Sequence, residues 1–177
     1  EVHFIAKAEV AGWPVFGLLA KLQRSVFVER GARRKAGEQA SEIATRMSNG
    51  DPMVLFAEGT TGDGNTLLPF KSTLFGAAQV ALSEGRSETV SIQPVAIAYT
   101  RLQGMPMDRR HRPHAAWIGD ADLMPHLAKL LREGAMDVEV HFGEPIEFRP
   151  GDDRKKVARE VEARVKKMFA EALRNPA

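Results

Sequence analysis

Short hydrophobic runs alternate with stretches of helical periodicity along most of the chain. Runs rich in β-branched and aromatic residues predict strands at residues 2–6, 25–29, 53–56, 90–98, 115–118 and 138–142. Apolar residues spaced three and four apart predict helices at residues 13–22, 38–48, 74–82, 125–132 and 154–173. This alternation is typical of layered α/β domains. We therefore predict an α/β fold in which helices flank a mixed, largely parallel sheet.

Two local signals refine this picture. The last helix is the clearest, because Val157, Val161 and Val165 form one apolar stripe between charged positions. Asp152 or Asp153 is expected to cap its N-terminus. Pro94 interrupts the hydrophobic run 90–98 and predicts a bulge or a sheet edge, because proline cannot donate a ladder hydrogen bond.

Composition narrows the class of protein. The chain has 177 residues, of which 44% are hydrophobic, and we expect a single domain over residues 1–177. Its formal net charge is only +2, far from the basic balance of a dedicated nucleic-acid binder. The absence of cysteine excludes disulfides, thiolate metal sites and cysteine nucleophiles. No run approaches the roughly 18 apolar residues that span a bilayer.

The segment 54–65 carries the strongest chemical signal. A hydrophobic strand there ends in Glu58, Gly59 and Thr60, followed by a flexible polar loop. Backbone N–H groups and the Thr60 hydroxyl can converge on an anion at the carboxyl end of a strand, which suits a phosphate. A long hairpin-like surface loop explains the same composition equally well.

Two nucleotide-binding patterns come close in this loop and fail. Residues 59–66 have the spacing of a P-loop, but Asn65 occupies the position of the lysine that reaches the β- and γ-phosphates. A dinucleotide-binding fingerprint starting at Gly62 has Leu67 in place of its third glycine. The sequence therefore argues against a nucleotide-binding enzyme.

Two cations flank the segment. Arg30 follows the strand 25–29 and could fork onto two anion oxygens, although a surface pair with Glu29 is the simpler interpretation. Lys71 lies beside the predicted helix 74–82, which Ser72 could cap. A lysine at a positive helix end favours an anionic partner, although plain solvent exposure is the alternative.

Taken in order, these blocks resemble the glycerolipid acyltransferases typified by lysophosphatidic acid acyltransferases. Three of that family's four blocks are present. Residues 28–30 match its strand with an acidic residue and arginine, and residues 92–97 match its proline-containing hydrophobic block. Residues 56–60 match its F-P-E-G-T block except that Ala57 replaces the proline, a change expected to alter only the turn. The H-x-x-x-x-D block is absent from these 177 residues. Residues 2–6 read as a strand already under way, so we expect the catalytic histidine and aspartate upstream of Glu1 and no catalytic residue within the chain.

The resemblance implies that an acceptor hydroxyl attacks an acyl thioester, carried by coenzyme A or acyl carrier protein. A histidine held by an aspartate acts as general base, without a metal, a cofactor or a covalent intermediate. Arg30, Glu58, Gly59, Thr60 and Lys71 map onto the substrate-binding region. Arg30 and Lys71 are expected to contact the anion, Gly59 and Thr60 to donate hydrogen bonds, and Glu58 to orient a cation or fix the loop through backbone N–H groups.

The acceptor and the place of action follow from the same resemblance. Thr61 replaces an arginine that commonly faces the acceptor phosphate, so the expected acceptor is lysophosphatidic acid or another lysolipid such as lyso-ornithine lipid. The place would be the cytoplasmic face of the inner or cell membrane, with peripheral attachment to the membrane surface and no nucleic-acid partner. The basic run 109–114 reads as a solvated loop or as a contact to anionic headgroups. A non-catalytic module that binds acidic lipid or acyl carrier protein is the alternative function.

Overall fold

The computed structural model describes residues 2–29, 33–119 and 121–176, with the backbone alone at residues 33–36. The chain divides into two compact units. The first unit comprises Glu1–Ala57, Lys71–Val90 and Glu147–Lys156. The second comprises Glu58–Phe70, Ser91–Ile146 and Val157–Ala177.

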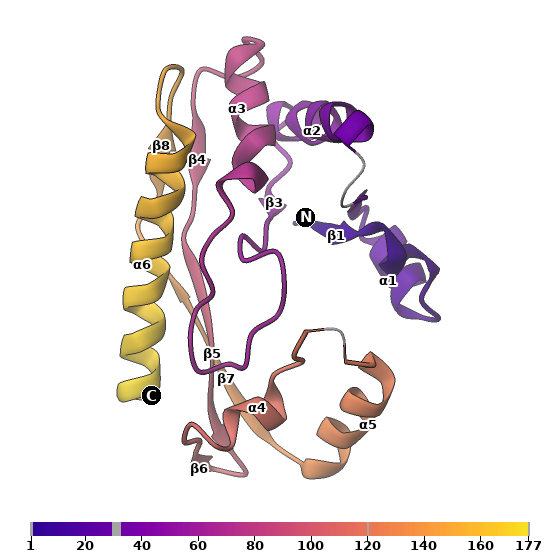
Figure 1. The fold of residues 1–177 in the computed structure, drawn as a ribbon, viewed down its shortest axis with the longest axis vertical. Helices are drawn as coiled ribbons and strands as arrows, with labels where there is room; N and C mark the ends of the chain where they lie inside the picture. The colour runs from indigo at the N-terminus through magenta and orange to yellow at the C-terminus, as the bar shows by residue number, and fades with distance from the viewer. Residues whose placement is uncertain (1, 30–32, 120, 177) are drawn as a thin grey trace. The chain divides into compact units, whose positions relative to one another are not determined.

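A parallel sheet organises the first unit (Figure 1). Its strands are β1 (His3–Lys7), β2 (Val26–Val28) and β3 (Met53–Val54), in the order β2-β1-β3. The 3-10 helix η1 (Ala8–Gly12) and α1 (Phe16–Leu22) connect β1 to β2, and α2 (Arg33–Ser48) leads to β3. Because both crossovers return the chain in the same direction, the carboxyl ends of these strands share one edge.

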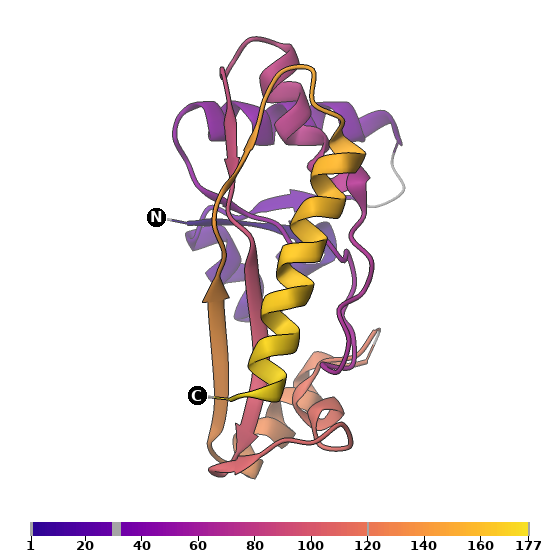
Figure 2. The ribbon, with the colours of Figure 1, turned by 90° about the vertical axis from the view of Figure 1, so that its left-hand side faces the viewer.

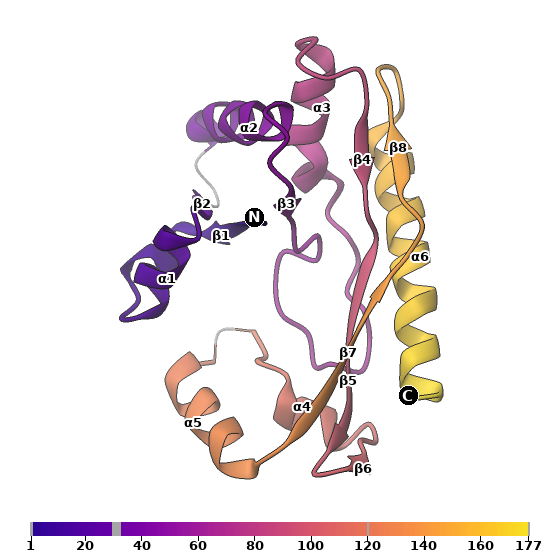
Figure 3. The same cartoon turned by 180° about the vertical axis from the view of Figure 1, so that it is seen from behind.

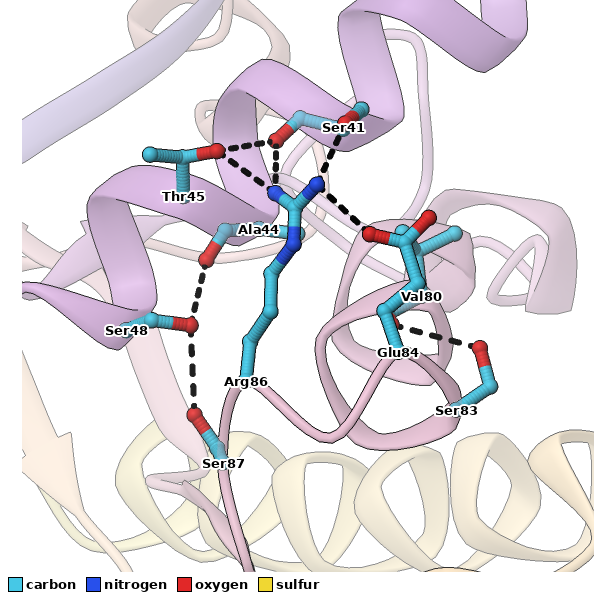
Figure 4. Close-up of polar contacts among 9 residues, drawn as sticks. All are labelled: Ser41, Ala44, Thr45, Ser48, Val80, Ser83, Glu84, Arg86 and Ser87. Carbon is cyan, nitrogen blue, oxygen red and sulfur yellow. Dashed lines mark hydrogen bonds and ion pairs between the residues drawn. The ribbon is translucent and has the colours of Figure 1, made fainter.

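Helix α2 packs on α3 (Gly76–Ser83), which follows the 3-10 helix η2 (Ser72–Phe75). Val26, Ile43 and Ala77 form the apolar centre of this unit. Polar contacts also reach α2, because the guanidinium of Arg86 donates hydrogen bonds to both oxygens of Ser41 (Figure 4). The loop after α3 is therefore held against α2.

An antiparallel sheet organises the second unit. It has the order β6-β5-β7, with β5 (Val95–Leu102), β6 (Met105–Pro106) and β7 (Met136–Phe142). Alternate β5 residues are buried or exposed, as the two-residue period of a half-buried strand requires: Ala96, Ala98 and Thr100 are buried. Helix α6 (Arg154–Arg174), which belongs mostly to this unit, lies alongside β5 (Figure 2).

The remaining elements are short. Helices α4 (Arg112–Ala115) and α5 (Leu123–Glu133) lie between β6 and β7. Strands β4 (Val90–Ile92) and β8 (Ile146–Phe148) pair with each other. A boundary between the two units falls inside each of these strands, after Val90 in β4 and after Ile146 in β8. No helix in the described ranges is both long and apolar enough to cross a bilayer.

The mixed α/β class is confirmed, and so is the α6 stripe, in which Val157, Val161 and Val165 are buried. Asp153 is the cap, since its Oδ1 accepts a hydrogen bond from the Lys155 N–H at 2.8 Å. Pro94 is fully buried between β4 and β5 and splits the predicted strand 90–98. That the two units act as one domain stays a prediction.

Two expectations were wrong. The described strands form three small sheets, of which the β2-β1-β3 sheet is parallel and the β6-β5-β7 sheet antiparallel, where one largely parallel sheet was expected. The predicted strand 115–118 is instead the end of α4 and the irregular segment after it. Pro113 suits the first turn of that helix, and the Ala116 N–H donates to the Arg112 carbonyl at 3.0 Å. Local hydrogen bonds thus outweighed the apolar composition of this segment.

Candidate functional site

The polar segment between β3 and η2 is a closed loop. In the first unit, the Lys71 N–H donates to the Ala57 carbonyl at 2.9 Å. In the second unit, the Leu68 N–H donates to Oε2 of Glu58 at 2.6 Å, and the Phe70 N–H donates to Oε2 of Glu162 on α6 at 2.8 Å. The segment is therefore a loop anchored by two carboxylates, those of Glu58 at its first position and of Glu162 on α6.

Glu58 is half-buried, and burial raises the pKa of its carboxyl above the ordinary value. The hydrogen bond from the Leu68 N–H opposes this rise without cancelling it. Of the roles expected for Glu58, fixing the loop through a backbone N–H group is the one this geometry displays. The hydrogen bond directs Oε2 of Glu58 to the Leu68 amide inside the loop.

The residues after Glu58 differ sharply in exposure. Gly59 is buried with φ +70°, a left-handed conformation that a side chain strains. Thr60 and Thr61 are exposed, and the Thr61 carbonyl accepts a long hydrogen bond from the Gly119 N–H at 3.4 Å. Glycine at 59 thus allows a turn that presents the two threonine side chains to solvent.

The far end of the loop is fixed by Asn65. Its backbone N–H donates to Oδ1 of Asp63 at 2.9 Å, and its side-chain amide donates to the Arg109 carbonyl at 3.0 Å. The hydrogen bonds from Asn65 lower the pKa of Asp63. Arg112 donates to Oδ1 of Asn65 at 3.2 Å and to the Met107 carbonyl at 2.8 Å.

Arg112 corrects the interpretation of the basic run. The run was expected to be a solvated loop or a headgroup contact, and Arg109, Arg110 and His111 are indeed exposed. Arg112, however, is 8% exposed and holds the loop from inside the second unit. The sequence concealed this role, because its hydrogen-bond partner Asn65 lies 47 residues away.

The first unit supplies the strand ends. A small open pocket of about 260 Å³ is lined by Lys7, Glu9, Val28 and Glu29, at the carboxyl ends of β1 and β2. Lys7 pairs with Glu9 at 3.6 Å. Arg30 would follow Glu29 directly, but it lies outside the described residues, so its contact with an anion stays a prediction.

Lys71 is exposed in the first unit, where it precedes η2. Ser72 was expected to cap a helix and does not, because it is the first residue of η2, and α3 begins four residues later at Gly76. The structure therefore brings Glu58, Gly59 and Thr60 together in the second unit and places Lys71 in the first.

The histidines occupy structural or surface positions in the described chain. His3 is buried, and its Nδ1 lies 3.1 Å from the Gln23 carbonyl. His111 and His141 each lie 2.8 Å from a neighbouring carboxylate, Asp108 and Glu139 respectively. Each carboxylate precedes its histidine by two or three residues, whereas the family pattern places an aspartate five residues after it.

Comparison with known proteins identifies the family. Residues 1–98 match the family model described as Acyltransferase. The chain belongs to the acyltransferase family. The resemblance carried by residues 28–30, 56–60 and 92–97 is thereby confirmed.

Two lyso-ornithine lipid O-acyltransferases are similar to this family member along nearly its whole length. The protein of Brucella abortus is 58% identical over 173 residues, and that of Rhizobium meliloti 51% over 174. A 1-acyl-sn-glycerol-3-phosphate acyltransferase of Neisseria gonorrhoeae is 27% identical over 95% of the chain and 61% of its own length. The chain spans 65% and 60% of the first two relatives, although they cover 98% of it.

A solved structure has the same fold. The 1-acyl-sn-glycerophosphate (LPA) acyltransferase PlsC of Thermotoga maritima superposes with a TM-score of 0.64. It is 19% identical in sequence, and the match covers 99% of this chain and 58% of that one. At this identity the likeness concerns the fold alone.

Like the role of Arg112, the role of Glu162 as an anchor of this loop was not predicted from the sequence. Glu162 lies four residues after the buried Ala158, so its side chain falls beside the buried stripe of α6. A carboxylate beside the buried face of a helix needs a hydrogen-bond donor, so the position of Glu162 could have indicated that it binds a backbone amide. The partner itself, Phe70, is 92 residues away and was not predictable.

Proposed function

We propose that the protein transfers a fatty acyl group from an acyl thioester to the hydroxyl of lyso-ornithine lipid, a step of membrane lipid biosynthesis. The observation that carries the proposal is the 58% and 51% identity to two lyso-ornithine lipid O-acyltransferases across 98% of the chain. Because the chain spans less than two thirds of those relatives, the activity is proposed for the whole protein.

The residue at position 61 favours this acceptor over lysophosphatidic acid. The family commonly has an arginine there, whose guanidinium suits a phosphate dianion. An ornithine headgroup carries an ammonium group, which an arginine would repel. Thr61 is exposed and uncharged, so it tolerates the ammonium. Sequence similarity and the chemistry of this position thus point to the same headgroup.

The substrate-binding roles follow from charge and position. Arg30 and Lys71 would pair with the carboxylate of the acceptor headgroup, as they would with a phosphate. Gly59 and Thr60 would donate hydrogen bonds, and Glu58 would hold the loop in shape through Leu68. The exposure of Thr60 and Lys71 and the inward hydrogen bond of Glu58 support this division.

The general base is proposed to lie outside these 177 residues. None of the five histidines is followed by aspartate at the fifth position. Loss of a general base typically costs about a hundred to ten thousand fold in rate. We therefore expect the 177 residues alone to transfer no acyl group above background, while weak acceptor binding survives because other residues carry it.

The place of action is proposed to be the cytoplasmic face of the membrane, with peripheral attachment through this part of the protein. Both substrates support this assignment. A lysolipid resides in the bilayer, and thioesters of coenzyme A or acyl carrier protein are soluble and cytoplasmic. Catalysis therefore requires the site to face the interface between the two.

The test is acceptor-dependent release of free thiol from an acyl thioester. The full-length protein should release thiol with lyso-ornithine lipid several times faster than with lysophosphatidic acid. Preference for lysophosphatidic acid would assign a different acceptor. Saturable lysolipid binding without thiol release would favour a non-catalytic binding module. Release by the 177 residues alone would show that one of their own histidines serves as base.

A further inference from the structure

Helix α1 turns leucines toward solvent. Its packed side consists of Phe16, Gly17 and Ala20, and Gly17 is so close to η1 that a Cβ would lie 2.5 Å from the Ala11 carbonyl oxygen. The opposite side is built of large aliphatic residues. Val15 is 68% exposed, Leu18 62%, Leu19 53% and Leu22 72%. Figure 3 shows α1 beside β1 and β2 in the first unit.

The backbone of Val15, the residue that precedes α1, has a strained conformation. Val15 has φ 62° and ψ −57°, which a β-branched residue rarely adopts. The Gly17 N–H donates to the Trp13 carbonyl and the Leu19 N–H to the Val15 carbonyl, both at 2.9 Å. Strain of this kind persists where the surroundings impose it. These two hydrogen bonds tie the first turn of α1 to the residues that precede it.

The charge around this face is positive. Residues 16–22 contain no acidic residue, and Lys21 and Arg24 lie at the carboxyl end of α1. Both line an open pocket of about 490 Å³ together with Arg46 and Asp51. Arg46 pairs with Glu42 at 3.1 Å, and Asp51 lies 3.9 Å from His3. The positive charges of Lys21 and Arg24 therefore give the segment that carries the exposed leucines a net positive charge.

We propose that α1 docks on an anionic lipid bilayer, with Leu18, Leu19 and Leu22 inserted among the acyl chains and Lys21 and Arg24 paired with lipid phosphates. The proposal rests on the proposed function for its partner, since a lysolipid acceptor lies in a membrane. Apolar side chains flanked by cations are the arrangement that binds an anionic interface. Charge complementarity favours a bilayer over a second copy of this chain, which would bring Lys21 and Arg24 against the same cations.

A dye placed on α1 tests the docking. The 177 residues contain no cysteine, so Leu22→Cys in a full-length protein without other cysteines accepts one environment-sensitive label. Leu131→Cys on α5 is the matched control, because Leu131 is 77% exposed. The label at 22 should shift to the blue with vesicles of phosphatidylcholine and phosphatidylglycerol, and the label at 131 should not.

Four results would overturn the proposal. The first two are unchanged emission of the label at position 22 when vesicles are added, and an equal shift of the label at position 131. The third is a label at position 22 whose emission is already blue-shifted before vesicles are added. The fourth is an emission shift at position 22 that depends on protein concentration in the absence of lipid. The last two would place another segment or a second copy on this face. Lys21→Gln with Arg24→Gln should weaken binding to the anionic vesicles by about fivefold per cation and leave binding to phosphatidylcholine vesicles unchanged.

Activity separates this inference from the proposed function. Leu18→Gln with Leu22→Gln should lower acyl transfer to an acceptor in anionic vesicles by about tenfold or more and preserve transfer to an acceptor in detergent micelles. Equal loss in both presentations would overturn the docking role. If the unaltered protein transfers no acyl group in either form, the proposed function fails, and the dye still decides the docking.

Discussion

Leu68 donates its backbone N–H to Oε2 of Glu58 at 2.6 Å, which closes the candidate loop around a half-buried carboxylate. The bond joins the residue that opens the loop to one ten positions later. It gives the Glu58 carboxylate a role in holding the loop, which is distinct from contact with an anion.

Glu58→Gln should keep the loop folded and raise stability at neutral pH. Burial raises the pKa of Glu58, so its contribution to stability is present at low pH and is lost as pH rises through the folded-state pKa. The amide of glutamine accepts the same hydrogen bond without a buried charge. The melting temperature should exceed that of the unaltered protein by on the order of 2 °C at pH 7, and the difference should vanish in acid. A deficit for Glu58→Gln at every pH would show that the fold needs the charge.

Gly59→Ala should destabilise the protein by about 1 kcal/mol, because Gly59 has φ +70° and a Cβ is disfavoured there. Gly62→Ala is the matched control within the loop. A Cβ at position 62 would meet Leu68 Cγ at 3.5 Å, an ordinary contact, and no left-handed φ applies there. Chemical denaturation of both variants provides the comparison. Equal stability of the two would remove the conformational argument for Gly59.

Glu162→Ala should cost about 1 to 3 kcal/mol, because it leaves the Phe70 N–H without its 2.8 Å acceptor. Glu160→Ala is the control on the same helix. Glu160 pairs with Arg164 at 2.7 Å on the surface, where such a pair contributes about 0.3 to 0.5 kcal/mol. Hydrogen exchange at Phe70 should accelerate in the first variant alone. Unchanged exchange there would mean that Glu162 does not anchor the loop.

Arg30→Ala and Lys71→Ala should each raise KM for the acceptor by about tenfold to a hundredfold, because a charge-assisted contact is worth roughly 1.5 to 3 kcal/mol. KM for the thioester should stay within about twofold. Lys167→Ala, which removes a cation 4.0 Å from Glu171 on the surface of α6, should alter neither. Steady-state kinetics with each substrate varied in turn decide the matter. Equal effects on both substrates would exclude Arg30 and Lys71 from the acceptor site.

Thr61→Arg should shift acceptor preference toward lysophosphatidic acid by about tenfold relative to lyso-ornithine lipid. The added guanidinium can pair with a phosphate through two hydrogen bonds and repels an ammonium group. Thr61 is exposed, so the larger side chain fits without repacking. Competition between the two lysolipids in one reaction measures the ratio directly. A constant ratio would show that position 61 does not face the headgroup.

The sequence by itself determined the features that depend on residues close to one another along the chain. The buried positions of the α6 stripe lie four residues apart, so helical periodicity predicted them. Its cap bonds an N–H only two residues away, so the local sequence narrowed the cap to Asp152 or Asp153. The glycine after Glu58 reflects a backbone conformation that few other residues adopt. The order of residues 28–30, 56–60 and 92–97 indicated the family, because chemistry constrains those residue types directly.

Only the tertiary structure decided which partner each polar group uses. Arg112 looked like one of several surface cations, yet it is buried because Asn65 and the Met107 carbonyl accept its hydrogen bonds. Glu162 became a loop anchor through an amide 92 residues away. A hydrogen bond requires its two groups to lie within about 3 Å of each other. The fold brings groups that are distant in sequence to that separation by burying apolar surface. Because apolar burial is not directional, the apolar pattern of the sequence does not reveal which polar groups will meet.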